Sequence, residues 1–196
     1  MSKIVAIIQA RMGSTRLPGK VLMNIENKPL LWHVIKRTIS SKYIKHVVVA
    51  VSNNRKDDVI ENFAKKYSFN LFRGSEEDCL DRYYKTAKKF SANVIVRVTG
   101  DCPLICPEII DKIISEYLKG SYDYVTNTLL YTYPDGCDVE VFSFKALKKA
   151  WQECKDPVDR EHVTPYIRNS GKFKIKNVEN ESPVDPGEYK WSVDRI

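Results

Sequence analysis

Residues 4–20 read IVAIIQARMGSTRLPGK, an apolar run followed by a loop that is rich in glycine and basic side chains. The unbroken run at 4–8 contains several β-branched residues, which is typical of a strand buried on both faces of a sheet. The loop after this strand must emerge at the carboxyl edge of the sheet, where open α/β sheets bind their ligands. This stretch therefore predicts an α/β fold with a ligand site on its first loop.

The first two thirds of the chain repeat this alternation of strand and helix. Further strands are predicted at 47–51, 70–72 and 94–98. Helices are predicted from apolar spacing and from the residues that start them, over 29–40, 57–67, 79–90 and 107–118. Such a succession favours a mostly parallel central sheet with helices on both sides, which is a three-layer α-β-α architecture.

The pattern changes after residue 122. Strands are predicted at 124–126, 139–142 and 173–178, and helices from about 143 and from about 160. A turn-rich loop that holds Pro134-Asp135-Gly136 separates the first two of these strands, and no repeat or low-complexity linker interrupts the chain. We therefore expect one domain over 1–196, with a mixed, partly antiparallel second half.

The bulk composition is that of an ordinary globular protein, with 43% hydrophobic and 29% charged residues. No apolar run approaches the ~20 residues that a membrane span needs, and the first residues lack the longer apolar stretch of a secretory leader. The five cysteines are odd in number and scattered, which predicts free thiols. Free thiols in turn suggest the reducing cytoplasm.

The net charge of +7 permits several kinds of anionic partner. The lysines are spread in pairs over several predicted helices, as at 65–66, 88–89 and 148–149, which is typical of solvated helix faces. A nucleic-acid binder would more often show a basic stripe interleaved with exposed aromatic side chains. We therefore expect no nucleic-acid partner, while a polyphosphate ligand remains compatible with the charge.

The first loop carries three permanent cations, Arg11, Arg16 and Lys20, with no acidic residue between them. Such a cluster repels itself unless an anion binds there, so it predicts a triphosphate site. Gly13 and Ser14 would let backbone amides and a hydroxyl approach that ligand closely. A P-loop is excluded, because the glycine spacing and the residue after Lys20 do not match it. The alternative is a basic surface turn.

An aspartate follows the predicted strand 94–98 and reaches the same edge of the sheet. Gly100 allows a sharp turn there, and Asp101 comes next. Bound phosphates would repel this carboxylate unless a hard cation lay between them, and magnesium binds one or two carboxylates together with phosphate oxygens. We therefore expect Asp101 to hold Mg²⁺. The alternative is that Asp101 caps the helix that begins near Pro107.

Together these residues resemble a known family. The pattern Ala-Arg-x-Gly-Ser-x-Arg-Leu-Pro-x-Lys at 10–20 is similar to the loop of the CTP-dependent cytidylyltransferases, and the likeness extends to 101–104, 160–166 and 191–194. It points in particular to the spore-coat polysaccharide biosynthesis branch, with similarity to 3-deoxy-manno-octulosonate and N-acylneuraminate cytidylyltransferases. The resemblance implies a nucleotide-diphospho-sugar transferase fold, which is related to that of the GT-A glycosyltransferases.

The resemblance also implies residue roles in nucleotide binding. The expected set is Gln9, Ala10, Arg11, Gly13, Ser14, Arg16, Lys20, Gly74, Asp78, Arg82 and Thr99. Within it, the three loop cations would hold the phosphates, and the backbone near Gln9 together with Asp78 and Arg82 would frame the cytosine. A surface loop with a helical ion pair explains Asp78 and Arg82 equally well. The catalytic residues would be Arg11, Lys20 and Asp101.

The second metal carboxylate of the family comes from a late Val-Asp pair, which corresponds to Val193-Asp194 here. The family pattern usually continues Val-Asp-Thr-Pro-Glu-Asp into a closing helix, whereas this sequence runs Asp194-Arg195-Ile196. The closing helix is therefore expected to be missing. If residue 196 is a native end, Asp194 would lie on a frayed terminus, and its role as a metal ligand would be in doubt.

The acceptor is expected against residues 122–196, while residues 1–121 bind the nucleotide. Asp138 and Glu140 alternate on one face of a predicted strand, which suits hydrogen bonds to sugar hydroxyls. Glu161 and His162 are expected near the start of a later helix, where they could orient an acceptor hydroxyl. An ordinary helix start explains Glu161 almost as well.

The reaction implied is in-line attack of an acceptor oxygen on the α-phosphate of CTP, with release of pyrophosphate. A sugar or sugar acid would receive CMP for surface-glycan synthesis, and the resemblance leaves a homodimer open. Three alternatives are a sugar-1-phosphate nucleotidylyltransferase with another nucleotide, a glycosyltransferase, and a non-catalytic nucleotide-binding partner in glycan assembly. The glycosyltransferase is disfavoured, because Cys102 and Pro103 replace the rest of an Asp-x-Asp pair after Asp101.

Overall fold

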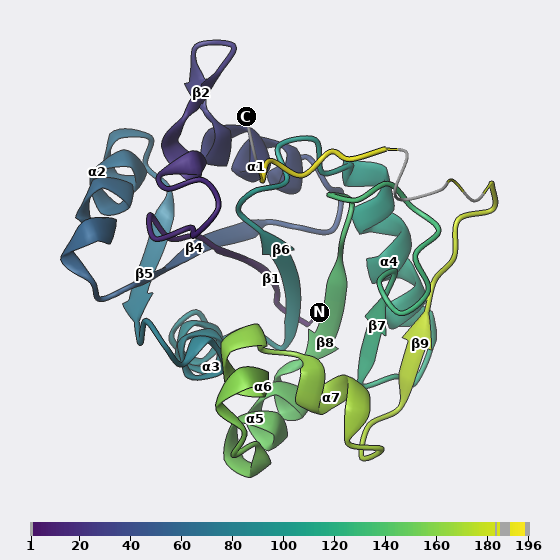
Figure 1. Cartoon of the computed structure of the whole chain (residues 1–196). Helices are drawn as coiled ribbons and strands as arrows, with labels where there is room; N and C mark the ends of the chain where they lie inside the picture. Colours follow the sequence, from purple (N-terminus) through teal and green to yellow (C-terminus); the bar gives the residue numbers. More distant parts are fainter. Residues whose placement is uncertain (1, 183, 185–188, 195–196) are drawn as a thin grey trace.

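The structure is a computed structural model that describes residues 2–182, 184 and 189–194. Its centre is a seven-stranded sheet with the order β5-β4-β1-β6-β8-β7-β9 (Figure 1). The strands are β1 (Ile4–Gln9), β4 (His46–Ser52), β5 (Asn70–Gly74), β6 (Val94–Thr99), β7 (Tyr124–Thr126), β8 (Glu140–Ser143) and β9 (Ile175–Asn177). The strands β5, β4, β1 and β6 are parallel, β8 is antiparallel to both β6 and β7, and β9 is parallel to β7. The predicted mixed sheet is confirmed.

Helices cover both faces of this sheet. One face packs against α1 (Leu30–Ile39), α2 (Asp58–Lys66) and α4 (Pro107–Lys119). The other carries α3 (Cys79–Lys89), α5 (Phe144–Glu153), α6 (Pro157–His162) and α7 (Pro165–Asn169). The side chains of β1 alternate between the two cores, since Ala6 and Ile8 face the first and Val5 and Ile7 the second. The continuous apolar run of β1 is explained by this burial on both sides.

The central position of β1 brings several loops to one edge. Gln9, the last residue of β1, lies opposite Ala50 in β4 and opposite Thr99 in β6. Because these strands are parallel, the loops after β1, β5 and β6 leave the sheet in the same direction. Residues far apart in the sequence therefore meet at the carboxyl edge, where the first loop was expected to bind its ligand.

Two local predictions differ from the structure. The helix expected from about residue 160 begins at Pro157, because the Asp156 carboxylate accepts hydrogen bonds from the N–H groups of Val158 and Asp159. A short hairpin was not expected, and it joins β2 (Asn24–Ile25) to β3 (Lys28–Pro29). Its turn residues, Glu26 and Asn27, both adopt positive φ without the glycine that usually announces such a turn.

The described part of the chain contains no helix with the length and apolarity that a bilayer crossing requires. All five cysteines lie within it, and each is a free thiol, as the sequence predicted.

Candidate functional site

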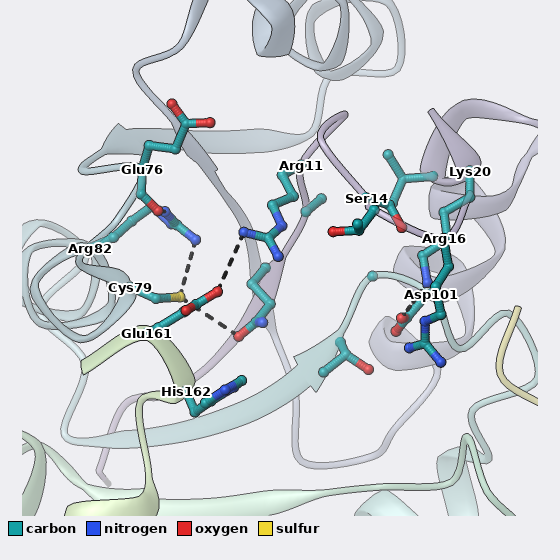
Figure 2. Close-up of a pocket in the computed structure, with 16 residues that line it drawn as sticks. Arg11, Ser14, Arg16, Lys20, Glu76, Cys79, Arg82, Asp101, Glu161 and His162 are labelled. Atoms are coloured by element: carbon teal, nitrogen blue, oxygen red, sulfur yellow. Dashed lines mark hydrogen bonds and ion pairs between the residues drawn. The ribbon is translucent and has the colours of Figure 1, made fainter. Parts of the chain in front are cut away.

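A cavity of about 380 Å³ opens at the carboxyl edge of the sheet (Figure 2). Its walls come from the loop after β1, the loop after β6, the start of α3 and the end of α6. Eleven residues predicted to form the site line it: Gln9, Ala10, Arg11, Ser14, Arg16, Lys20, Arg82, Thr99, Asp101, Glu161 and His162. Figure 2 shows two ends, one with Lys20, Arg16 and Asp101 and the other with Arg82, Cys79 and Glu76.

At the first end, Lys20 is buried between oxygen atoms from distant parts of the chain. Its ammonium donates to Asp101 Oδ2 at 2.7 Å, to Asp194 Oδ1 at 3.0 Å and to the Val193 carbonyl at 2.8 Å. Burial by itself would lower the pKa of Lys20, but the hydrogen bonds and charges of the two aspartates raise it above its ordinary value. Lys20 was expected to face phosphate, and here it joins two carboxylates instead.

Asp194 is firmly held, which corrects the expectation of a frayed position. Its side chain is only 11% exposed, and the N–H of Val193 donates to the Asp101 carbonyl at 2.9 Å. Desolvation works against ionisation, yet the hydrogen bond and charge of Lys20 hold the pKa of Asp194 below its ordinary value. Asp101 and Asp194 therefore converge on the Lys20 ammonium group.

The remaining two loop cations stay open to a ligand. The side chains of Arg11 and Arg16 are 50% and 57% exposed. Arg16 lies 3.0 Å from Asp194, and Arg11 lies 3.8 Å from Glu161 of α6. Exposed ion pairs of this kind contribute little to stability, so both guanidinium groups are free to turn toward an anion at small cost.

The other end of the cavity combines the buried side chains of Arg82 and Cys79 with the exposed side chain of Glu76. Arg82 is 4% exposed and donates to the Ser75 carbonyl and to the Cys79 sulfur, the latter at 3.0 Å. Gly74 makes room for it, because a Cβ at that position would lie 2.9 Å from Arg82 Cγ. Gly74 thus shapes the wall without lining the cavity, and Gly13 also lies outside the lining.

Asp78 does not reach the cavity lining. One of its oxygens accepts from the N–H of Asp81 and caps α3, and the other lies 2.7 Å from the guanidinium of Arg160. Arg160 in turn donates to the carbonyls of Trp151 and Cys154 at the end of α5. Asp78 therefore links α3 to α6 through Arg160, which is neither the predicted contact with cytosine nor the ion pair within one helix given as the alternative.

The Glu140 carboxylate is also bound by other side chains inside the protein. Its side chain is 5% exposed and lies 2.8 Å from the guanidinium of Arg97, and its other oxygen accepts from the Thr164 hydroxyl at 3.0 Å. Glu140 is buried and does not line the cavity, so the structure does not place it where it could meet a sugar hydroxyl. Asp138 precedes β8 and does not line the cavity either, so its contact with the acceptor stays a prediction. Burial, and then the charges of Asp135 and Glu140, raise the pKa of Asp138 to about 6.

Glu161 and His162 reach the cavity from the end of α6, whereas a helix start was expected (Figure 2). The chain turns there through Val163, which has φ 74° and ψ −57°. The N–H of Thr164 donates to the His162 carbonyl at 2.9 Å, which closes a tight three-residue turn. A buried β-branched residue with positive φ is strained, and such strain is found most often at functional positions.

The predicted site set omits five residues that line the cavity: Thr15, Val21, Glu76, Cys79 and Gly100. Cys79 and Glu76 lie at the same end of the cavity as Arg82 (Figure 2), and no sequence pattern indicates their place there. Arg97 lies behind the cavity floor, and for this residue a signal did exist. It is the one charged residue in the apolar strand run VIVRVT, at a position that must be buried and therefore needs a partner.

Comparisons with known proteins agree with this geometry. A family model described as cytidylyltransferase matches residues 5–184. The spore coat polysaccharide biosynthesis protein SpsF of Bacillus subtilis is 35% identical over 99% of this chain and 82% of its own length. An uncharacterized protein of Methanocaldococcus jannaschii is 43% identical over 99% of this chain and 79% of its own.

Solved structures give the same result. A cytidylyltransferase from Leptospira borgpetersenii superposes with a TM-score of 0.93 at 37% identity, covering 99% of this chain and 82% of that one. A CMP:2-keto-3-deoxy-manno-octonic acid synthetase in complex with CTP shares the fold at a TM-score of 0.72 and 22% identity, over 99% and 94% of the two chains. The chain therefore belongs to the cytidylyltransferase family and is a nucleotidyltransferase.

Proposed function

We propose that this enzyme transfers CMP from CTP to a sugar acid and releases pyrophosphate. The observation that carries the proposal is the cavity at the sheet edge, which is lined by the half-exposed cations of the first loop, with two carboxylates converging on Lys20 at one end and the buried side chains of Arg82 and Cys79 at the other. The end with Lys20 and Arg16 suits a triphosphate, and the end with Arg82 suits a base. Transfer to phosphorus needs mainly positioning and charge neutralisation from the protein, and these residues supply both.

The acceptor class follows from relatives that share part of the chain. A 3-deoxy-manno-octulosonate cytidylyltransferase of Geobacter sulfurreducens is 38% identical over 57% of this chain and 44% of its own length. With SpsF named for polysaccharide biosynthesis, this favours an acidic sugar destined for a surface glycan. Asp138, Glu161 and His162 are the residues proposed to orient its hydroxyls. A homodimer and a cytoplasmic location stay predictions.

The residues around Lys20 fit a magnesium ion. Two carboxylates and one backbone carbonyl gather around a single point, and all are the hard oxygen donors that magnesium prefers. Asp101 and Asp194 would hold the ion, which would neutralise phosphate charge when bound. The Lys20 ammonium now satisfies the same oxygens. If magnesium neutralised the two carboxylates, the Lys20 ammonium would be close enough to bind the phosphates instead.

Pyrophosphate release tests this function. The wild type is incubated with magnesium, a panel of 2-keto-3-deoxy sugar acids and sugar phosphates, and each of CTP, UTP, GTP and ATP in turn. We expect release with CTP and one acidic sugar, and Lys20→Met should lower turnover by roughly 10²–10³-fold, the usual scale for one charge-stabilising group.

The matched control is Lys148→Met, because Lys148 is an exposed lysine on α5. It should leave turnover unchanged. Release only with another nucleotide would identify a sugar-1-phosphate nucleotidylyltransferase. Tight CTP binding without pyrophosphate release in the presence of any acceptor would identify a non-catalytic nucleotide-binding partner.

A further inference from the structure

The side chain of Gln9 is oriented by donors that lie behind the cavity. Its amide oxygen accepts from Arg97 Nε at 3.2 Å and from the Cys79 thiol at 3.9 Å. An arginine can only donate, so the oxygen of the amide must face Arg97 and the amino group must face away. Gln9 itself is half-buried in the cavity wall.

Both donors are fixed in their protonation states. Burial disfavours charge on Arg97, but the nearby Glu140 carboxylate more than compensates and raises the pKa of Arg97 above its ordinary value. Burial raises the pKa of Cys79, so this residue remains a thiol. Glu140 is held in turn by Thr164. Gln9 therefore cannot exchange its oxygen and amino group without losing the hydrogen bond to a buried charge.

The Gln9 amino group is thus the end of the amide left to meet a ligand, since no other residue in the described part of the chain accepts from it. The O2 and N3 atoms of cytosine are both acceptors, whereas uracil carries a donor at N3. A donor fixed in the cavity wall would pair with cytosine and meet the N3–H of uracil unfavourably. Sites built around one hydrogen-bond polarity reject the wrong partner strongly, because a buried group is left unpaired.

We propose that Gln9 is a specificity-determining residue that selects cytosine by its amino group, and that Arg97 is a positioning residue that fixes the orientation of Gln9. This inference rests on the proposed function, since it takes CTP as the nucleotide. It assigns base selection to a side chain at the end of β1, in addition to the backbone of the first loop. Successive hydrogen bonds from Thr164 to Glu140, from Arg97 to Glu140 and from Arg97 to Gln9 support this orientation from the residue before α7.

Gln9→Glu is the sharpest test, because glutamate has the same shape and offers an acceptor where glutamine offers a donor. One carboxylate oxygen can still accept from Arg97, so the second faces the base. Dissociation constants for CTP and UTP are measured by calorimetry with magnesium, which requires no acceptor. We expect the wild type to prefer CTP and Gln9→Glu to weaken CTP binding by roughly 10²-fold, with a much smaller change for UTP.

Two further variants separate orientation from charge. Arg97→Lys keeps a cation beside Glu140 but cannot reach both carboxylate and amide, so the preference for CTP over UTP should relax toward unity. Gln152→Glu makes the same chemical change at an exposed position of α5 and should alter neither constant. Melting temperatures of all variants are recorded, so that unfolding is not mistaken for lost selectivity.

The outcomes distinguish the two proposals. A folded Gln9→Glu protein that retains the wild-type ratio of CTP to UTP affinity overturns the role of Gln9 and leaves the cytidylyltransferase function intact. A wild type that binds neither nucleotide overturns both. A ratio that collapses in Gln9→Glu and in Arg97→Lys, but not in Gln152→Glu, establishes both roles.

Discussion

At this site, a single side chain contacts residues that are distant from it and from one another in the sequence. Lys20 belongs to the first loop, Asp101 follows the fourth parallel strand, and Asp194 comes from the last described segment, yet one ammonium group touches both carboxylates. Removing Lys20 would leave Asp101 without its ion-pair partner, whereas removing either aspartate would leave Lys20 paired with the other. Their arrangement is a stabilising contact, and it is also the place where we propose that a divalent ion binds.

The pKa of Asp138 predicts how the stability of the protein changes with pH. Its pKa rises from 3.8 to about 6 in the folded protein, first through burial and then through Asp135 and Glu140, with Asp101 adding to the rise and Arg97 opposing it. Between these values the folded chain holds the proton that the unfolded chain has released. Stability therefore falls as pH increases from about 4 to about 6, and the loss is complete above that window.

Asp138→Asn removes this penalty because the amide carries no charge. At pH 7.5 the variant should be more stable than the wild type by up to about 3 kcal/mol, from the size of the pKa shift, and should melt several degrees higher. At pH 4 the two should melt together. Turnover should fall if Asp138 binds the acceptor. Equal melting temperatures at pH 7.5 would contradict the unfavourable burial of this carboxylate.

At the scale of elements, α6 is joined to its neighbours by Arg160. The guanidinium binds Asp78 at the start of α3 and the last carbonyls of α5. The helix is only six residues long and buries none of its side chains, so polar contacts rather than a core hold it. The clamp matters to the site, because the strained turn after α6 presents Glu161 and His162 to the cavity.

The structural role of Asp78 can be separated from a nucleotide contact. In Asp78→Asn the amide oxygen can still cap α3, but the ionic bond to Arg160 is lost. We expect a loss of about 1–2 kcal/mol in unfolding free energy, measured by urea denaturation, and less than a threefold change in CTP affinity. A tenfold weaker affinity for CTP, with unchanged stability, would restore the base contact that the sequence suggested.

Elements were easier to predict from the sequence than the partners of their polar residues. Apolar runs and alternating patterns predicted every strand of the main sheet, because burial on one or both faces of a strand requires apolar residues at regular positions. Asp78 and Glu140 were placed correctly on their elements and yet given ligand roles, since nothing local reveals that Arg160 or Arg97 will meet them. The start of α6 at Pro157 differs from the predicted start near 160, because the Asp156 side chain caps the first turn.

At the scale of the molecule, the segment 189–194 completes the site. It returns across the sheet edge after β9 (Figure 1), where the N–H of Trp191 donates to the Asp135 carbonyl at 2.7 Å and Val193 bonds to Asp101. These contacts place Asp194 beside Lys20. The nucleotide-binding half therefore depends on a segment from the second half of the chain. From the sequence alone, this segment was expected to be frayed.

Gly136 is the point where this dependence can be tested. It has φ +101°, and a Cβ there would lie 2.6 Å from Ser192 N and 2.7 Å from Trp191 C. Gly136→Ala must therefore displace the 189–194 backbone. We expect Asp194 to leave Lys20 and pyrophosphate release to fall by about 10²-fold, the scale for one lost charge-stabilising group. Gly171 also has positive φ, at +69°, but no atom lies within 4 Å of its added Cβ.

Gly171→Ala is accordingly the matched control, because it carries the conformational strain of about 1 kcal/mol without the collision. Melting temperature and pyrophosphate release are compared for the two variants. If the 189–194 segment supplies a working carboxylate, both variants lose stability but only Gly136→Ala loses turnover. Equal turnover in the two would mean that Asp194 is dispensable, and the divalent ion would then depend on Asp101 and the phosphates alone.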